Sequence, residues 1–91
     1  STVGILGMGA IGKALAKRLL PFDCSILCFD EKPIHFEHDS EKARFTPLDE
    51  ILQASDFLVI ALPLTERTKH LINSDAIKRL KNTCYLINTA R

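Results

Sequence analysis

Short apolar runs alternate with amphipathic segments along this chain, and this alternation limits the folds open to it. The runs comprise residues 2–6, 25–29, 57–62 and 84–88. Each is short and lacks polar alternation, which is typical of a strand buried on both faces. Strands that alternate with helices form a parallel sheet, because each right-handed crossover places its helix on one face. We therefore expect an α/β fold with a doubly wound parallel sheet.

The segment between the first two runs has the pattern of an amphipathic helix. Apolar residues recur at helical spacing at Ile11, Leu15 and Leu19, and lysines occupy the opposite side. Pro21 ends this segment, because proline cannot continue a helix. Residues 31–45 are rich in charge and lack periodicity. We expect a surface loop without regular structure there.

Two further helices are predicted by the residues that would begin them. Thr46 offers a capping hydroxyl, Pro47 suits the first helical position, and a short helix would reach about Ala54. Asn73 or Ser74 can cap the next helix. Its buried side would comprise the apolar residues Ala76, Ile77 and Leu80. The sequence thus predicts about four strands and three helices.

The turn after the first run carries the pattern G-x-G-x-x-G at Gly7, Gly9 and Gly12. The motif alone is a weak signal, but here it follows a buried strand and opens a helix, so backbone N–H groups can face a pyrophosphate. Gly7 would permit the tight turn, Gly9 would let phosphates approach the backbone, and Gly12 would let the helix pack closely on the sheet. A glycine-rich turn without a ligand is the alternative. The pattern favours a Rossmann-like dinucleotide site.

Asp30 follows the second run, eighteen residues after Gly12. This is near the spacing at which a carboxylate accepts both ribose hydroxyls of NAD, and a phosphate on the 2′ position would be repelled there. Glu31 could fill the same role, and Lys32 leaves room for some NADP binding. The expected cofactor is NAD.

Four positions of chemical interest directly follow the four runs, namely Gly7, Asp30, Pro63 and the segment 89–91. The carboxyl ends of parallel strands share one edge of a sheet, and ligands bind there in open sheets. At the last position, Arg91 offers a planar fork of donors that suits a carboxylate or another oxyanion. An ordinary surface arginine is the alternative interpretation of Arg91.

Over its whole length the chain resembles the NAD-binding domain of the D-isomer-specific 2-hydroxyacid dehydrogenases. The residues that carry the resemblance are the glycine motif at 7–12, Asp30 and the stretches 61–68, 71–73 and 86–91. The resemblance implies contacts between the pyrophosphate and the backbone of Ala10 and Ile11. It implies that the cofactor cleft is lined by Ala61, Leu62 and Pro63. Thr89 and Ala90 would lie beside the nicotinamide. Arg91 would correspond to the catalytic arginine that holds the substrate's carboxylate and carbonyl.

The resemblance implies an oxidoreductase that transfers a hydride between a nicotinamide cofactor and a D-2-hydroxy acid. The family's catalytic carboxylate and histidine, and its substrate domain, have no counterpart in these residues, so we expect residues 1–91 to be the N-terminal portion of an NAD-binding domain. The full-length protein would be a homodimer. Residues 61–63 replace the more usual His-Cys-Pro. Together with the glycine motif at residues 7–12 they resemble phosphonate (phosphite) dehydrogenases, which is one alternative. A non-catalytic, NAD(H)-sensing corepressor-type domain is another.

Composition narrows the partners. Twelve Lys and Arg against eleven Asp and Glu leave a formal charge of +1, which is no electrostatic footprint for nucleic acid or an anionic membrane. No apolar run approaches the roughly 18 residues of a membrane span, and no signal peptide is recognisable. We expect a cytoplasmic protein whose partner is a small molecule, and the resemblance implies that this is a 2-hydroxy or 2-oxo acid.

No metal is expected. The cluster His35, Glu37, His38 and Asp39 contains suitable ligand types, but a solvated, charged loop explains it better. The three cysteines lack CxxC spacing, so we expect them to be reduced. Cys24 and Cys28 are interpreted as small buried hydrophobes.

Overall fold

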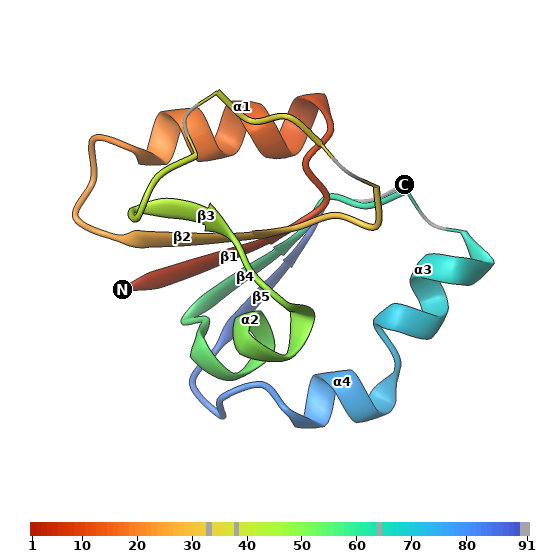
Figure 1. The fold of residues 1–91 in the computed structure, drawn as a ribbon. Coiled ribbons are helices and arrows are strands. Elements are labelled where there is room, and N and C mark those ends of the chain that lie inside the picture. Colours follow the sequence, from red (N-terminus) through yellow and green to blue (C-terminus); the bar gives the residue numbers. More distant parts are fainter. Residues whose placement is uncertain (33, 38, 64, 90–91) are drawn as a thin grey trace.

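A parallel sheet lies between helices in this computed structural model (Figure 1). The structure describes residues 1–32, 34–37, 39–63 and 65–89. In these ranges the sheet has five strands in the order β3-β2-β1-β4-β5. They are β1 (Thr2–Leu6), β2 (Ser25–Phe29), β3 (Ala43–Phe45), β4 (Phe57–Ile60) and β5 (Tyr85–Asn88). The chain moves outward from β1 in both directions, so the predicted α/β, Rossmann-like, doubly wound sheet is confirmed.

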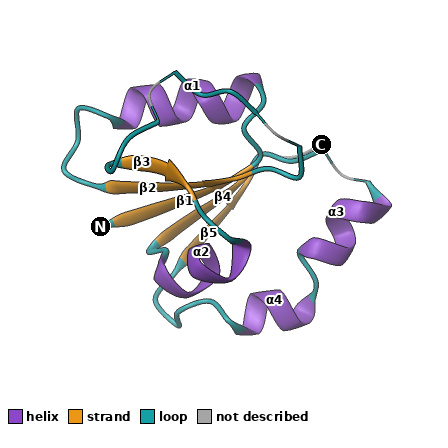
Figure 2. Ribbon diagram, viewed as in Figure 1, coloured by secondary structure: helices purple, strands orange, loops and turns teal. Residues whose placement is uncertain are grey.

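Helices cover both faces of this sheet, as Figure 2 shows. They are α1 (Ala10–Leu19), α2 (Leu48–Ala54), α3 (Glu66–Leu71) and α4 (Ser74–Lys78). Helix α1 lies on one face, and the other three helices lie on the opposite side. None of the helices in the described part of the chain is both long and apolar enough to cross a membrane.

Alternate side chains of the strands supply two separate apolar cores. On the side of α1, Val3 and Ile5 pack with Ala16 of the helix. On the other side, Leu6 and Leu58 pack with Ile51 of α2 and its neighbours. Because successive strand residues point to opposite faces, a strand buried on both faces needs an unbroken apolar run. This explains why β1, β2 and β4 were recognisable in the sequence.

The prediction for residues 31–45 was wrong in one part. Residues Ala43–Phe45 form β3, which pairs in parallel with residues 26–28 of β2. Only Ala43 of this strand is fully buried, so its own sequence lacks the apolar run of the inner strands. Pairing with β2, and not local sequence, makes this segment a strand.

The helix predictions need three corrections. The sequence signals missed α3 altogether. Helix α2 begins at Leu48 with Pro47 at its N-cap, so Pro47 precedes the helix and the Thr46 side chain does not cap it. Asn73 caps α4, and its buried side contains Ala76, whereas Ile77 is 48% exposed.

Strand β5, which lies at one side of the sheet, is more exposed than predicted. All four of its residues are exposed, although the apolar run predicted a strand buried on both faces. In the described part of the chain β5 pairs only with β4. The Tyr85 ring stacks on Phe57, with ring centroids 5.3 Å apart, but it remains 67% exposed.

Candidate functional site

The carboxyl ends of four strands meet at one edge of the sheet. The register aligns Leu6 with Phe29 and Ile60, and Ile60 with Asn88. Backbone hydrogen bonds extend this register one residue further. They join the N–H groups of Gly7, Ala61 and Thr89 to the carbonyls of Phe29 (2.7 Å), Leu6 (2.7 Å) and Ile60 (2.9 Å), respectively. The prediction that these strand ends share an edge is confirmed.

A cleft of about 490 Å³ opens at this edge. Its walls come from the glycine-rich turn, the end of β2, the end of β4 and the beginning of α3. The lining residues are Gly7, Gly9, Ala10, Ile11, Asp30, Glu31, Lys32, Ile34, Ala61, Leu62, Pro63, Thr65 and Thr68. The structure therefore brings together most of the residues that the sequence singled out. A second hollow, lined by residues 30–32 and also by Ile34, His35 and Phe45, adjoins it.

Gly7 forms the turn that leads from β1 into α1. Its φ of 105° lies in the region that favours glycine. A Cβ at this position would lie 2.7 Å from the backbone carbon of Ala61 and from the backbone nitrogen of Leu62. Gly7 thus permits both the turn and the close approach of the β4 end.

Gly9 and Gly12 have opposite surroundings. A Cβ at Gly9 would meet no atom within 4 Å, and the φ of −73° at Gly9 suits any residue. A Cβ at Gly12 would overlap the carbonyl oxygen of Gly7 and touch Ile5 at 3.4 Å. The fold therefore needs glycine at Gly12. At Gly9 the space lies open beside the cleft, where a ligand can approach the backbone.

The N-terminus of α1 faces this cleft without a capping side chain. Gly9 is the N-cap residue and makes no side-chain cap bond, and the first turn contains no acidic residue. Basic residues instead occupy the last turn, at Lys17 and Arg18. The first N–H groups of a helix lack partners within it and carry partial positive charge. This end of α1 is suited to an anion such as a phosphate.

The Asp30 carboxylate is held by two backbone donors. Its Oδ2 accepts a hydrogen bond of 2.7 Å from the Met8 N–H, and its Oδ1 accepts one of 3.0 Å from the Lys32 N–H. The carboxylate is thereby fixed between the glycine-rich turn and the loop after β2. Each oxygen of an ionised carboxylate has a further lone pair, so two hydroxyl donors can still bind. Glu31 lines the same cleft.

The far wall of the cleft is held by a capping box that the sequence analysis missed. Thr65 Oγ1 accepts from the Thr68 N–H at 3.2 Å, and Thr68 Oγ1 accepts from the Thr65 N–H at 2.8 Å. The usual signal for this arrangement has Glu or Gln at the third helical position. Two threonines spaced three apart would have revealed α3.

Thr89 lies at the end of β5 but does not line the cleft. Its N–H and its hydroxyl both donate to the Ile60 carbonyl, each at 2.9 Å. These bonds fasten the end of β5 to the end of β4. Ala90 and Arg91, which were also predicted site residues, lie outside the described residues.

Among the described residues, the remaining candidate groups do not line the cleft. Among the described residues no group of three or more His, Cys, Asp and Glu side chains could hold a metal, and His38 of the proposed cluster falls outside them.

Cys28 is buried, and burial raises the pKa of its thiol to about 12, with a smaller contribution from Asp39. A thiol with such a pKa is unreactive. Cys24 lies just before β2 and packs against the same core.

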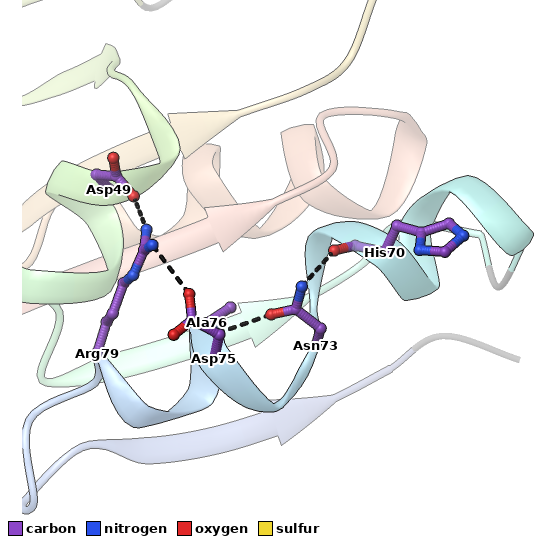
Figure 3. A network of polar contacts seen from close by, with 6 residues as sticks. All are labelled: Asp49, His70, Asn73, Asp75, Ala76 and Arg79. Carbon is purple, nitrogen blue, oxygen red and sulfur yellow. Dashed lines mark hydrogen bonds and ion pairs between the residues drawn. The ribbon is translucent and has the colours of Figure 1, made fainter.

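A polar network ties α3, α4 and α2 together, and none of the residues labelled in Figure 3 lines the cleft. Asn73 accepts from the Ala76 N–H at 2.9 Å and donates to the His70 carbonyl at 3.0 Å. Arg79 pairs with Asp49 of α2 and, at 2.9 Å, with Asp75. His70 takes part in this network through its backbone, and its ring points away from it. The network fastens α4 to its neighbours α3 and α2.

Comparisons with known proteins agree with this geometry. The family described as D-isomer specific 2-hydroxyacid dehydrogenase, NAD binding domain, matches residues 1–91. A glyoxylate reductase of Thermofilum pendens is 47% identical over 91 residues, covering 99% of this chain and 27% of that protein. A glyoxylate reductase of Pyrococcus horikoshii is 44% identical over 90 residues, with the same coverage.

Solved structures share the fold at similar levels of identity. An NAD-dependent formate dehydrogenase from Staphylococcus aureus, in complex with NAD, has a TM-score of 0.83 at 40% identity and covers 99% of this chain and 27% of its own. A D-lactate dehydrogenase from Treponema pallidum has a TM-score of 0.87 at 37% identity and covers 100% of this chain and 27% of its own. The chain thus spans about a quarter of the length of the relatives it matches.

Proposed function

Because the chain belongs to the NAD-binding domain family of the D-isomer-specific 2-hydroxyacid dehydrogenases, we propose that its cleft binds NAD as part of an oxidoreductase. The reaction is hydride transfer between the nicotinamide and a small D-2-hydroxy acid. One observation carries the proposal. The glycine-rich turn, the open end of α1 and the Asp30 carboxylate line the same cleft, and the Met8 N–H joins the turn to the carboxylate at 2.7 Å.

The residues of the cleft fit a dinucleotide in the following way. The backbone of Gly9, Ala10 and Ile11 receives the pyrophosphate at the N-terminus of α1, where no side chain intervenes. Asp30 accepts the ribose hydroxyls and disfavours a 2′-phosphate. Leu62 and Pro63 form the opposite wall. Thr89 and Ala90 belong beside the nicotinamide, a role that rests on the family resemblance.

The substrate class follows from the family and from the names of its relatives, which include glyoxylate reductases. Arg91 would hold the carboxylate of a 2-oxo or 2-hydroxy acid through its planar fork of donors. A guanidinium cannot serve as a base, so the substrate's hydroxyl proton must be exchanged by a group other than Arg91. In this proposal residues 1–91 are one part of a longer enzyme.

Titration of the full-length protein with NADH and with NADPH tests the cofactor assignment. We expect clearly tighter binding of NADH, because a 2′-phosphate would meet the Asp30 carboxylate. Equal affinities would contradict the assignment to Asp30. Absence of binding would overturn the proposed function.

Turnover assays test the reaction and separate it from its alternatives. We expect NADH oxidation with glyoxylate or another small 2-oxo acid, and a loss of about 30- to 1000-fold in rate for Arg91→Ala. Arg91→Lys should restore only part of the rate, because a point charge lacks the fork. NAD reduction with phosphite, without any reaction of 2-hydroxy or 2-oxo acids, would favour the phosphonate dehydrogenase alternative. NADH binding without any turnover would favour the sensing, corepressor-type alternative.

Location and assembly are part of the same proposal. The cytoplasm keeps thiols reduced, which suits the free Cys24, Cys28 and Cys84. We propose a homodimer for the full-length protein from the family resemblance. Light scattering of the purified protein measures its assembly state.

A further inference from the structure

Thr68 combines burial with an unusual set of hydrogen bonds at the wall of the cleft. The residue is 4% exposed and lines the cleft. Its hydroxyl oxygen lies 2.7 Å from the Pro63 carbonyl, 3.0 Å from the Thr65 carbonyl and 2.8 Å from the Thr65 nitrogen. Of these contacts, a capping box needs only the last.

The single proton of this hydroxyl can be shared between the two carbonyls, and the shorter distance favours Pro63. The oxygen at the same time accepts from the Thr65 N–H. One side chain thus connects α3 both to the backbone of Pro63 and to the backbone of the N-cap residue Thr65. Pro63 has no N–H of its own with which to anchor its backbone. The position of the Pro63 wall therefore depends on Thr68.

We propose that Thr68 is a positioning residue of the cofactor site, whose hydroxyl fixes the Pro63 wall at the distance that NAD requires. This inference rests on the proposed function. A purely structural cap would lower the stability of α3 without changing the cofactor affinity of the folded protein. A positioning residue changes that affinity.

Thermodynamic linkage gives the inference a test without any substitution. If the Thr68 cap strengthens cofactor binding, then the cofactor must strengthen the cap by the same factor. The amide of Thr65, which donates to Thr68 Oγ1, should therefore exchange with solvent more slowly when NADH is bound. The amide of Ala61 is a matched control, because Ala61 also lines the cleft but its N–H donates to the Leu6 carbonyl, so NADH should slow its exchange less.

Two substitutions at Thr68 separate the hydroxyl from the shape of the side chain. Thr68→Val keeps the shape and removes the hydroxyl, so we expect the Kd for NADH to rise about tenfold in the folded, full-length protein. Thr68→Ser keeps the hydroxyl and should stay within about twofold of the original protein. Thr46→Val is the control, because Thr46 is 7% exposed, makes a long 3.5 Å contact with a proline carbonyl and does not line the cleft.

The results distinguish this inference from the proposed function. Slower exchange at Thr65 with NADH, together with weaker binding by Thr68→Val and unchanged binding by Thr46→Val, would support it. If the original protein binds NADH but Thr65 exchange slows no more than that of Ala61, or Thr68→Val binds as tightly, the inference is overturned and the proposed function stands. If Thr68→Val does not fold, the Thr65 exchange decides. If the original protein does not bind NADH, both fail.

Discussion

The backbone N–H of Met8, inside the glycine-rich turn, donates a 2.7 Å hydrogen bond to the carboxylate of Asp30 at the end of the neighbouring strand. The two residues are 22 positions apart in the chain. Their contact means that the carboxylate expected to accept the ribose hydroxyls also holds the turn expected to receive the pyrophosphate. Substitution of Asp30 should therefore affect both ends of the site.

Asp30→Ala should weaken NADH binding by about 10- to 100-fold, because hydrogen bonds to a charged group are lost. The preference for NADH over NADPH should narrow, because the repulsion of a 2′-phosphate disappears. Calorimetric titration with both cofactors measures the two effects. Asp23→Ala, at an exposed aspartate before β2, is the control and should change neither. An unaltered preference in Asp30→Ala would show that another residue selects the cofactor.

The glycine-rich turn offers a matched pair of substitutions. Gly9→Ala should leave the thermal midpoint nearly unchanged, because a Cβ there meets no atom within 4 Å. It should still weaken NADH binding, because the methyl group occupies the path to the backbone. Gly12→Ala should instead destabilise the fold by about 1 to 3 kcal/mol, because its Cβ overlaps the Gly7 carbonyl. Undiminished NADH binding by Gly9→Ala would mean that the turn does not receive phosphate.

Substitution of Ser55 should increase the stability of the fold. It is fully buried between β1 and α2, and its hydroxyl finds no hydrogen-bond partner among the described residues. Ser55→Ala removes this unpaired group and should raise the free energy of unfolding by about 1 kcal/mol. The matched substitution Ser40→Ala should not stabilise, because Ser40 accepts from the Ala43 N–H at 3.3 Å. A lower thermal midpoint for Ser55→Ala would contradict the unpaired hydroxyl.

Asp56 gives the stability of the fold a dependence on pH. Hydrogen bonds from the Thr2 N–H at 2.8 Å and from Lys81 at 3.1 Å lower the pKa of this carboxyl below its ordinary value of 3.8. A carboxyl with a lower pKa in the folded state stabilises the fold above its unfolded pKa. That contribution is lost as the pH falls through the folded pKa.

Thermal unfolding between about pH 5 and pH 2 measures the contribution of Asp56. In Asp56→Asn the decrease of the midpoint on acidification should be shallower than in the original protein. An identical slope in Asp56→Asn would show that the two hydrogen bonds do not favour the ionised form.

The parts of the fold that were predicted have local signals. Strands β1, β2 and β4 have unbroken apolar runs because both of their faces are buried. Gly7 and Gly12 must be glycine because a Cβ at either position would overlap backbone atoms. Since the strands are parallel and in register, their order alone was enough to place Asp30 and Pro63 at the same edge. The cleft could be assembled from these elements.

Two of the parts that were missed depend on contacts between distant residues. Strand β3 follows from pairing with β2, and its exposed Arg44 gives no strand signal. The bond from Met8 to Asp30 depends on the path of the turn, which no spacing rule describes. Helix α3 did leave a local signal, but Thr68 stands where a capping box usually has a longer side chain.

The central claim is that NAD binds at the carboxyl edge of the sheet, and amide chemical shifts measured with and without NADH test it most directly. The account predicts that the amides of Met8, Gly9, Lys32 and Ala61 shift on addition of NADH. At the opposite edge, where β2, β4 and β5 begin, the amides of Ser25, Asp56 and Tyr85 should keep their positions. Shifts confined to that opposite edge, or unchanged amides in the glycine-rich turn at saturating NADH, would contradict the account.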